Sequence, residues 1–151
     1  MRIIKADVGQ IDAAAELFDQ YRQFYGQESD IAGAEAFLAD RLSEGESVVF
    51  LASRDGVGSE QVGFAQLYPV FSSISMQRLW ILNDLFVAPD TRSRGIGRAL
   101  IERCFELARA TGAKGVALET MKDNHRAKAL YESLGFQIDA HCDHYEWIKP
   151  S

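Results

Sequence analysis

The chain has 151 residues, of which 47% are hydrophobic and 25% charged. These are ordinary values for a globular protein, so they exclude a disordered or fibrous chain, and the length predicts one domain over residues 1–151. The formal net charge of −6 argues against nucleic acid as a partner. No apolar run is long enough to span a bilayer, and the first residues lack a secretory pattern, so we expect a cytoplasmic protein with no membrane partner.

The first third of the chain predicts one strand followed by two helices. Residues 2–6 alternate in polarity as a strand does. Asp7 and Gln10 have the spacing of a capping box, which precedes apolar residues at helical spacing over 9–25. A second helical pattern covers 30–43, and its first residue is an aspartate of the kind that caps a helix.

The end of the first predicted helix is unusually aromatic, with the sequence Tyr-Arg-Gln-Phe-Tyr over 21–25. Packing against a core accounts for such a face, because aromatic side chains bury large apolar areas. The hydroxyl groups of Tyr21 and Tyr25 are also suited to line a substrate pocket. Both interpretations stay open at this stage.

The next segment predicts a β-hairpin. Residues 47–53 and 61–68 have the composition of strands, and residues 69–75 predict a loop to the next strand. Gly63, inside the second strand, indicates a bulge or a close approach of another segment. The residues that predict the turn between the two strands are Asp55, Gly56, Gly58 and Ser59.

The most informative stretch begins with residues 79–87, whose bulky apolar side chains predict a buried strand. Pro89 follows, and the segment 92–98, Arg-Ser-Arg-Gly-Ile-Gly-Arg, opens a helix. Glycine at a helix start lets the backbone approach a ligand, and the free N–H groups there favour an anion. The sequence therefore predicts a phosphate or pyrophosphate site. Leu100 argues against a dinucleotide fingerprint, and no Gly-Lys-Ser/Thr of a P-loop occurs.

The last third predicts the remaining elements. The third helix ends at Gly112, and a strand over 113–121 leads to a fourth helix that Gly135 ends. Two closing strands are predicted over 136–139 and 144–148. The whole order predicts an α/β fold with a mixed sheet of about seven strands and about four helices, in which the crossover through the third helix supplies a parallel neighbour to the central strand.

Two motifs resemble those of the GNAT acyltransferase superfamily. The sequence Arg-x-x-Gly-x-Gly over 92–97, directly after Leu-Phe-Val, is similar to the loop that binds the pyrophosphate of coenzyme A in that family. The sequence Asn-x-x-Ala-x-x-Leu-Tyr-x-x-x-Gly-Phe over 124–136 is similar to its last motif. The resemblance implies central strands splayed to admit coenzyme A, acetyl-CoA as cosubstrate, and compatibility with a homodimer.

The resemblance also implies roles for individual residues. Tyr131 matches the tyrosine that donates a proton to the departing thiolate of coenzyme A, and a phenol with a pKa near 10 remains protonated for that task. A backbone N–H near Leu85 or Phe86 would polarise the acetyl carbonyl. The residues that the resemblance places at the coenzyme are Leu85, Phe86, Val87, Arg92, Ser93, Arg94, Gly95, Ile96, Gly97, Arg98, Asn124, Ala127 and Tyr131.

The residues expected near the amine acceptor match the family pattern less well. Residues 82–87 resemble a strand of diamine acetyltransferases, but Asn83 stands where that group carries its glutamate base, so we expect it to contact substrate instead. Asp84 is the candidate base, although a regular strand directs it to the face opposite Asn83 unless a bulge intervenes. Glu119 or a water relay are the alternatives.

The function that the sequence favours is transfer of acetyl from acetyl-CoA to a primary amine of a small molecule. Acetylation of lysine or an N-terminus in a protein is the alternative within the enzyme class, and a non-catalytic acyl-CoA-binding regulatory module is the alternative outside it. His141, Cys142 and His144 lack the ligand number and spacing of a metal site, so no metal is expected. Both cysteines, Cys104 and Cys142, are expected to be free thiols.

Overall fold

The computed structural model describes residues 1–54, 60–92 and 94–151, and the chain divides into two compact units, 1–119 and 120–151. The predicted turn residues Asp55, Gly56, Gly58 and Ser59 and the loop residue Ser93 lie outside the described residues. The elements of the first unit are β1 (Arg2–Lys5), η1 (Val8–Gln10), α1 (Ile11–Phe24), α2 (Ile31–Ser43), β2 (Val48–Ser53), β3 (Gln61–Ser72), β4 (Gln77–Val87), η2 (Pro89–Thr91), α3 (Ile96–Ala110) and β5 (Val116–Ala117).

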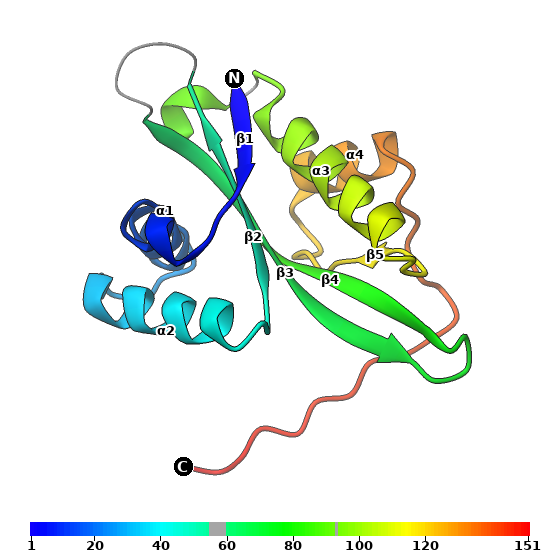
Figure 1. The fold of residues 1–151 in the computed structure, drawn as a ribbon. Coiled ribbons are helices and arrows are strands. Elements are labelled where there is room, and N and C mark those ends of the chain that lie inside the picture. The colour runs from blue at the N-terminus through cyan, green and yellow to red at the C-terminus, as the bar shows by residue number, and fades with distance from the viewer. Residues whose placement is uncertain (55–59, 93) are drawn as a thin grey trace. The chain divides into compact units, whose positions relative to one another are not determined.

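The five strands form one sheet in the order β1-β2-β3-β4-β5. The first four pair antiparallel, and β5 pairs parallel to β4 after the crossover through α3, as the sequence predicts. Helices α1 and α2 cover one face of the sheet and α3 covers the other (Figure 1). The predicted α/β fold with a mixed sheet and four helices is therefore confirmed, whereas the sheet has five strands among the described residues instead of about seven.

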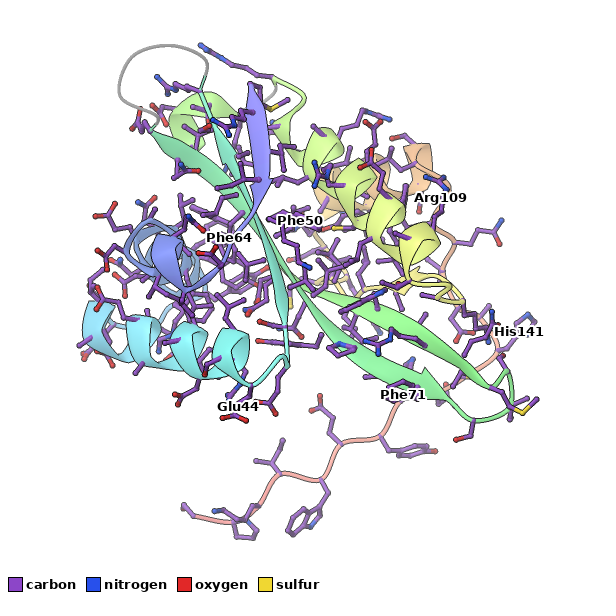
Figure 2. All side chains as sticks on the ribbon, in the orientation of Figure 1. Glu44, Phe50, Phe64, Phe71, Arg109 and His141 are labelled. Carbon is purple, nitrogen blue, oxygen red and sulfur yellow. The ribbon has the colours of Figure 1, made fainter. Side chains whose placement is uncertain are left out.

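The two faces of the sheet bury different side chains. Phe64 of β3 points to the α1 side, where it contacts the Phe18 ring edge-on at a centroid distance of 6.2 Å. Phe50 of β2 points to the α3 side, where the Arg103 guanidinium lies 5.1 Å from its ring centroid (Figure 2). A Cβ atom on Gly63 would lie 3.2 Å from the nearest atom of Ile96 on α3, so the close approach predicted at Gly63 is confirmed.

The predicted helix caps are present. Asp7 Oδ1 accepts a hydrogen bond from the Gly9 N–H at 2.7 Å, and the capping box with Gln10 starts the short helix η1 ahead of α1. Asp30 Oδ1 accepts from the Gly33 N–H at 2.9 Å and caps α2. Buried Asp19 on α1 accepts from the Asp30 N–H at 2.7 Å, and this bond lowers the pKa of the Asp19 carboxyl and fixes the start of α2 beside α1.

The prediction of a loop over 69–75 is wrong. Strand β3 continues to Ser72 and β4 starts at Gln77, so the two form one long hairpin with Pro69 opposite Trp80 and Phe71 opposite Arg78. The Arg78 guanidinium lies 5.2 Å from the Phe71 ring centroid and 5.3 Å from that of Trp80. The contact with Phe71 joins the two strands, and it extends the hairpin through a segment whose composition is loop-like.

The predictions for the strands late in the sequence are also wrong in extent. The strand predicted over 113–121 covers only Val116–Ala117. The segments 136–139 and 144–148 form neither helix nor strand, and residues 137–151 are all exposed. Alternating polarity makes a strand only where a neighbouring strand completes its hydrogen bonds, and no pairing to these two segments occurs among the described residues.

The second unit holds helix α4 (His125–Ser133). Asn124 caps it, since its Oδ1 accepts a hydrogen bond from the Ala127 N–H at 3.2 Å. Gly135 ends it with a φ of 97°, a left-handed conformation that glycine adopts without strain. None of the helices in the described parts of either unit is long and apolar enough to cross a membrane.

Candidate active site

Strand β4 changes its pairing halfway along its length. Trp80 and Ile81 pair with β3 on one side and with β5 on the other. From Leu82 to Val87, the described strand pairs only with β3. The β5 side of this half, which we call the free half of β4 (Leu82–Val87), therefore has no strand partner in the described part of the chain. The expected splaying of the central strands stays a prediction.

A β-bulge lies at the start of the free half. Gln66 of β3 is opposite Asp84, but its neighbour Leu67 is opposite Leu82, so Asn83 is an extra residue on β4. An extra residue reverses the alternation of side chains that follows it. Trp80 accordingly faces α3, where its Nε1 donates to Thr111 Oγ1 at 2.9 Å, whereas Phe86 belongs to the core on the α1 side. The bulge thus brings Asp84 to the α1 face.

The backbone directions in the free half follow from two contacts at its end. The Ala88 N–H donates to Val62 O of β3 at 2.8 Å. Since N–H groups alternate in direction along a strand, those of Leu85 and Val87 point away from β3, toward the open edge, while that of Phe86 points to β3. Val87 O shares the outward direction and accepts from Arg92 Nε at 3.1 Å. Of the two predicted carbonyl-polarising donors, the geometry favours Leu85.

Asp84 is the buried acid of this region, with 5% of its surface exposed. Its Oδ2 accepts from Gln66 Nε2 at 2.8 Å, and its Oδ1 accepts from Asn83 Nδ2 at 3.2 Å. Burial raises the pKa of the Asp84 carboxyl, and the hydrogen bonds from Gln66, Asn83 and Tyr21 oppose that rise. A buried carboxyl group with a raised pKa and fixed oxygens is a candidate proton acceptor.

Tyr21 supports both interpretations of the aromatic end of α1. Its ring packs against Phe64 and Phe86 at centroid distances of 5.8 and 6.2 Å, as a core residue does. Its hydroxyl donates to Asn83 O at 3.4 Å, so it also reaches the bulge. Tyr25 lies beside it at 5.0 Å and is half exposed. Tyr21, Asn83 and Asp84 are thereby brought together, as expected for an acceptor site.

The segment after β4 contains the predicted anion-binding loop. Gly95 has a φ of 77° and is the N-cap of α3, without a side-chain cap for the helix. The first N–H groups of α3, beginning with Ile96 and Gly97, therefore have no intrahelical partner. Arg94 and Arg98 are exposed on the same turn.

Arg92 has a different position from the one that the sequence suggests. Besides the bond to Val87 O, its guanidinium lies 5.6 Å from the Phe24 ring centroid and 5.9 Å from that of Phe86. It thus connects the end of α1 to the free half of β4. In this structure Arg92 makes contacts that hold the loop in place, and the exposed charge is that of Arg94 and Arg98.

In the second unit, the residues of the last motif are neighbours on α4. Asn124 and Ala127 are joined by the capping hydrogen bond, and the Tyr131 ring packs edge-on against Phe136 at 5.8 Å. The motif therefore sets the start of α4 and holds the ring of its tyrosine. The described residues contain no group of three potential metal ligands. Cys104 is buried, which raises the pKa of its thiol to about 12, and Cys142 is exposed; both are free.

Two residues beside Asp84 were not predicted. Gln66 is fully buried in the middle of β3, and Tyr68, two residues along, has a pKa raised to about 12 by burial and by the negative charge of Asp84. A polar residue inside the apolar run Phe-Ala-Gln-Leu over 64–67 was the only signal for Gln66. Its partner could not be identified without the strand register.

Comparisons with known proteins agree with this geometry. Residues 13–136, which include both motifs, match the family model described as the acetyltransferase (GNAT) family. The chain is 47% identical over 145 residues to the uncharacterized N-acetyltransferase YhfO of Bacillus subtilis (strain 168), with 96% of this chain and 95% of that protein covered. It is 31% identical over 139 residues to a probable acetyltransferase of Haemophilus influenzae, with 92% of each covered. A crystal structure of a probable acetyltransferase matches it with a TM-score of 0.94 and 39% identity, over 100% of this chain and 99% of that one.

Proposed function

Since this chain belongs to the acetyltransferase (GNAT) family, we propose that it transfers the acetyl group of acetyl-CoA to a primary amine of a small molecule. The observation that carries the proposal is the free half of β4, which is followed directly by the glycine-started helix α3. The free half of β4 has backbone groups that can pair with an extended chain, and the start of α3 has N–H groups that can bind an anion.

The residues present fit coenzyme A. The outward N–H groups of Leu85 and Val87 and the carbonyl of Leu85 would pair with the amides of its pantetheine arm. The N-terminus of α3 at Ile96 and Gly97 would hold its pyrophosphate, with charge from Arg94 and Arg98. When bound, the coenzyme supplies an activated acetyl thioester. No metal takes part in this proposal.

The acetyl transfer requires the amine nitrogen to lose two protons and the coenzyme sulfur to gain one. An amine with a pKa near 10.4 is almost wholly protonated at neutral pH, so it must lose a proton before its nitrogen can form the new bond to the acetyl carbon. Asp84 accepts that proton. As the carbon–sulfur bond breaks, the Leu85 N–H stabilises the carbonyl oxygen, and the family motif assigns to Tyr131 the donation of a proton to the sulfur. The nitrogen then loses its second proton, which restores the Tyr131 phenol.

We propose a compact acceptor in place of a protein. Tyr21 reaches Asn83 O with its hydroxyl, and the Tyr25 ring packs against that of Tyr21, so the two tyrosines offer an aromatic surface that suits a small cation with an apolar part. The net charge of −6 also favours a cationic acceptor. A cytoplasmic location and a homodimer are part of the same proposal.

The test is a thiol-release assay with acetyl-CoA and a panel of polyamines, amino acids, aminoglycosides and lysine peptides. We expect release with a small amine and a product heavier by one acetyl group. Tyr131→Phe should lower kcat by at least tenfold and leave the Kd of coenzyme A within about twofold, because only the proton donor is lost. Coenzyme binding without release with any amine would instead select the regulatory module, and acetylation of the peptides alone would select a protein acetyltransferase.

A further inference from the structure

Gln66 occupies a position that packing alone does not explain. Its side chain is fully buried on β3, directly opposite Asp84. Its Nε2 donates to Asp84 Oδ2 at 2.8 Å, while its Oε1 has no hydrogen-bond partner among the described residues. A buried amide oxygen without a partner is unfavourable, so an apolar side chain would fill the same space at lower cost.

The orientation of the amide follows from the charge of its partner. An ionised carboxylate only accepts hydrogen bonds, so the NH₂ group of Gln66 must face Asp84 and its oxygen must face away. The unpartnered oxygen is thus a consequence of donating to an anionic Asp84. Gln66 stabilises the Asp84 carboxylate through its NH₂ group, and its own oxygen is left without a hydrogen bond.

The other groups around Asp84 do not replace Gln66. From α1, the Tyr21 hydroxyl contributes a hydrogen bond, and from β4 the exposed Asn83 contributes a longer one, at 3.2 Å. From β3, the half-buried Tyr68 phenol faces the negative charge of Asp84. The positive charge of Arg41 on α2 lowers the pKa of that phenol. Among the groups that favour the ionised Asp84, the bond from Gln66 has the largest effect, and at 2.8 Å it is shorter than the bond from Asn83.

We propose that Gln66 is a positioning residue that fixes the Asp84 carboxylate on the α1 face of the free half and keeps it ionisable despite its burial. This inference rests on the proposed function for its effect on turnover. Its effect on Asp84 itself can be measured on the protein without any substrate.

The experiment is a titration of Asp84 in Gln66→Met, which has a similar volume but no donor. The Asp84 signal is followed by carboxyl ¹³C NMR and is assigned by its absence in Asp84→Asn. We expect the midpoint to rise by about one pH unit, a tenfold increase in proton affinity. Gln61→Met, on the same strand opposite Ser53, is the matched control and should leave the midpoint unchanged.

A midpoint within about 0.3 units of the parent protein would overturn the inference. If Gln66→Met does not unfold cooperatively, the same titration is made on Gln66→Asn, whose shorter amide is drawn back from Asp84 and should also raise the midpoint. A lack of shift in that variant would overturn the inference equally.

The pH profile of kcat/KM separates this inference from the proposed function. Loss of the Gln66 donor raises the Asp84 pKa, so the acid limb should move to higher pH by the shift seen in the titration. If the titration shifts and the acid limb does not, Gln66 still positions Asp84, but Asp84 is not the proton acceptor. If the titration does not shift, the inference fails whatever the activity.

Discussion

The two halves of β4 belong to one strand but have different surroundings. From Gln77 to Ile81, the strand pairs with β3 and reaches β5 at Trp80 and Ile81, and its buried Trp80 is held by Thr111. From Leu82 to Val87, it pairs only with β3 among the described residues, and the bulge at Asn83 separates the two parts. The first half uses its hydrogen-bonding groups to build the sheet, whereas the outward N–H groups of Leu85 and Val87 in the second half have no strand partner among the described residues.

The difference shows how a rigid strand can carry a binding edge. An open edge is a liability in most sheets, since it attracts other strands. Here the edge is short, and Arg92 already occupies the outward carbonyl of Val87. The bulge adds a second effect, because it exchanges the faces of the following residues and so puts the Asp84 carboxyl on the α1 face, directly before the outward Leu85 N–H.

The largest effect is expected from removal of the Leu85 N–H. Replacing this amide by an ester, with the leucine side chain kept, removes the proposed donor to the acetyl oxygen. We expect kcat to fall by about 10²- to 10³-fold, as for loss of one such donor. The melting temperature should change little, because this N–H points away from β3.

The ester at Val87 is the control for that substitution, since its N–H points to the same edge but lies farther along the strand. It should affect coenzyme affinity more than kcat. Equal losses of kcat in the two esters would contradict a special role for Leu85.

A smaller effect is expected from the charge at the end of the free half. Arg94→Gln removes an exposed charge beside the start of α3 and should raise the Kd of coenzyme A by about three- to tenfold, less so at high salt. Arg92→Gln should have a weaker effect on Kd and a clearer one on the KM of the amine, since Arg92 contacts Phe24 and Val87.

Arg109→Gln is the control in the same calorimetric titration, because it removes the same charge from the exposed opposite end of α3 (Figure 2). It should leave Kd within about 1.5-fold, since charges beyond a Debye length are screened. A loss of affinity in Arg109→Gln as large as in Arg94→Gln would mean that only net charge matters.

The smallest effect on activity is expected in the paired half of β4. Trp80→Phe removes the hydrogen bond to Thr111 and part of a buried side chain, so the free energy of unfolding should fall by about 2 kcal/mol in urea denaturation. At a temperature where the variant is folded, kcat and KM should change less than twofold. A loss of turnover like that of the Leu85 ester would show that the two halves are not separate in function.

Much of the fold could be predicted from local sequence patterns. Helical spacing and the caps Asp7 and Asp30 located the helices to within a few residues, because a helix satisfies its hydrogen bonds within one segment. The glycine at position 95 and the strand before it likewise indicated the anion site. The strands predicted over 136–139 and 144–148 failed for the converse reason, since a strand needs a partner that its own sequence does not supply.

The sequence by itself determined the order of the elements from β1 to α4, the parallel crossover through α3 and the two motifs of the family. Only the tertiary structure decided which face Asp84 takes, since one extra residue at Asn83 reverses the faces of all that follow and leaves no mark in composition. It also decided that Arg92 holds the loop and that Gln66 donates to Asp84. The contacts of Gln66 with Asp84 and of Arg92 with Phe24 join residues 18 or more positions apart in the chain, and only strand register and helix packing bring such residues together.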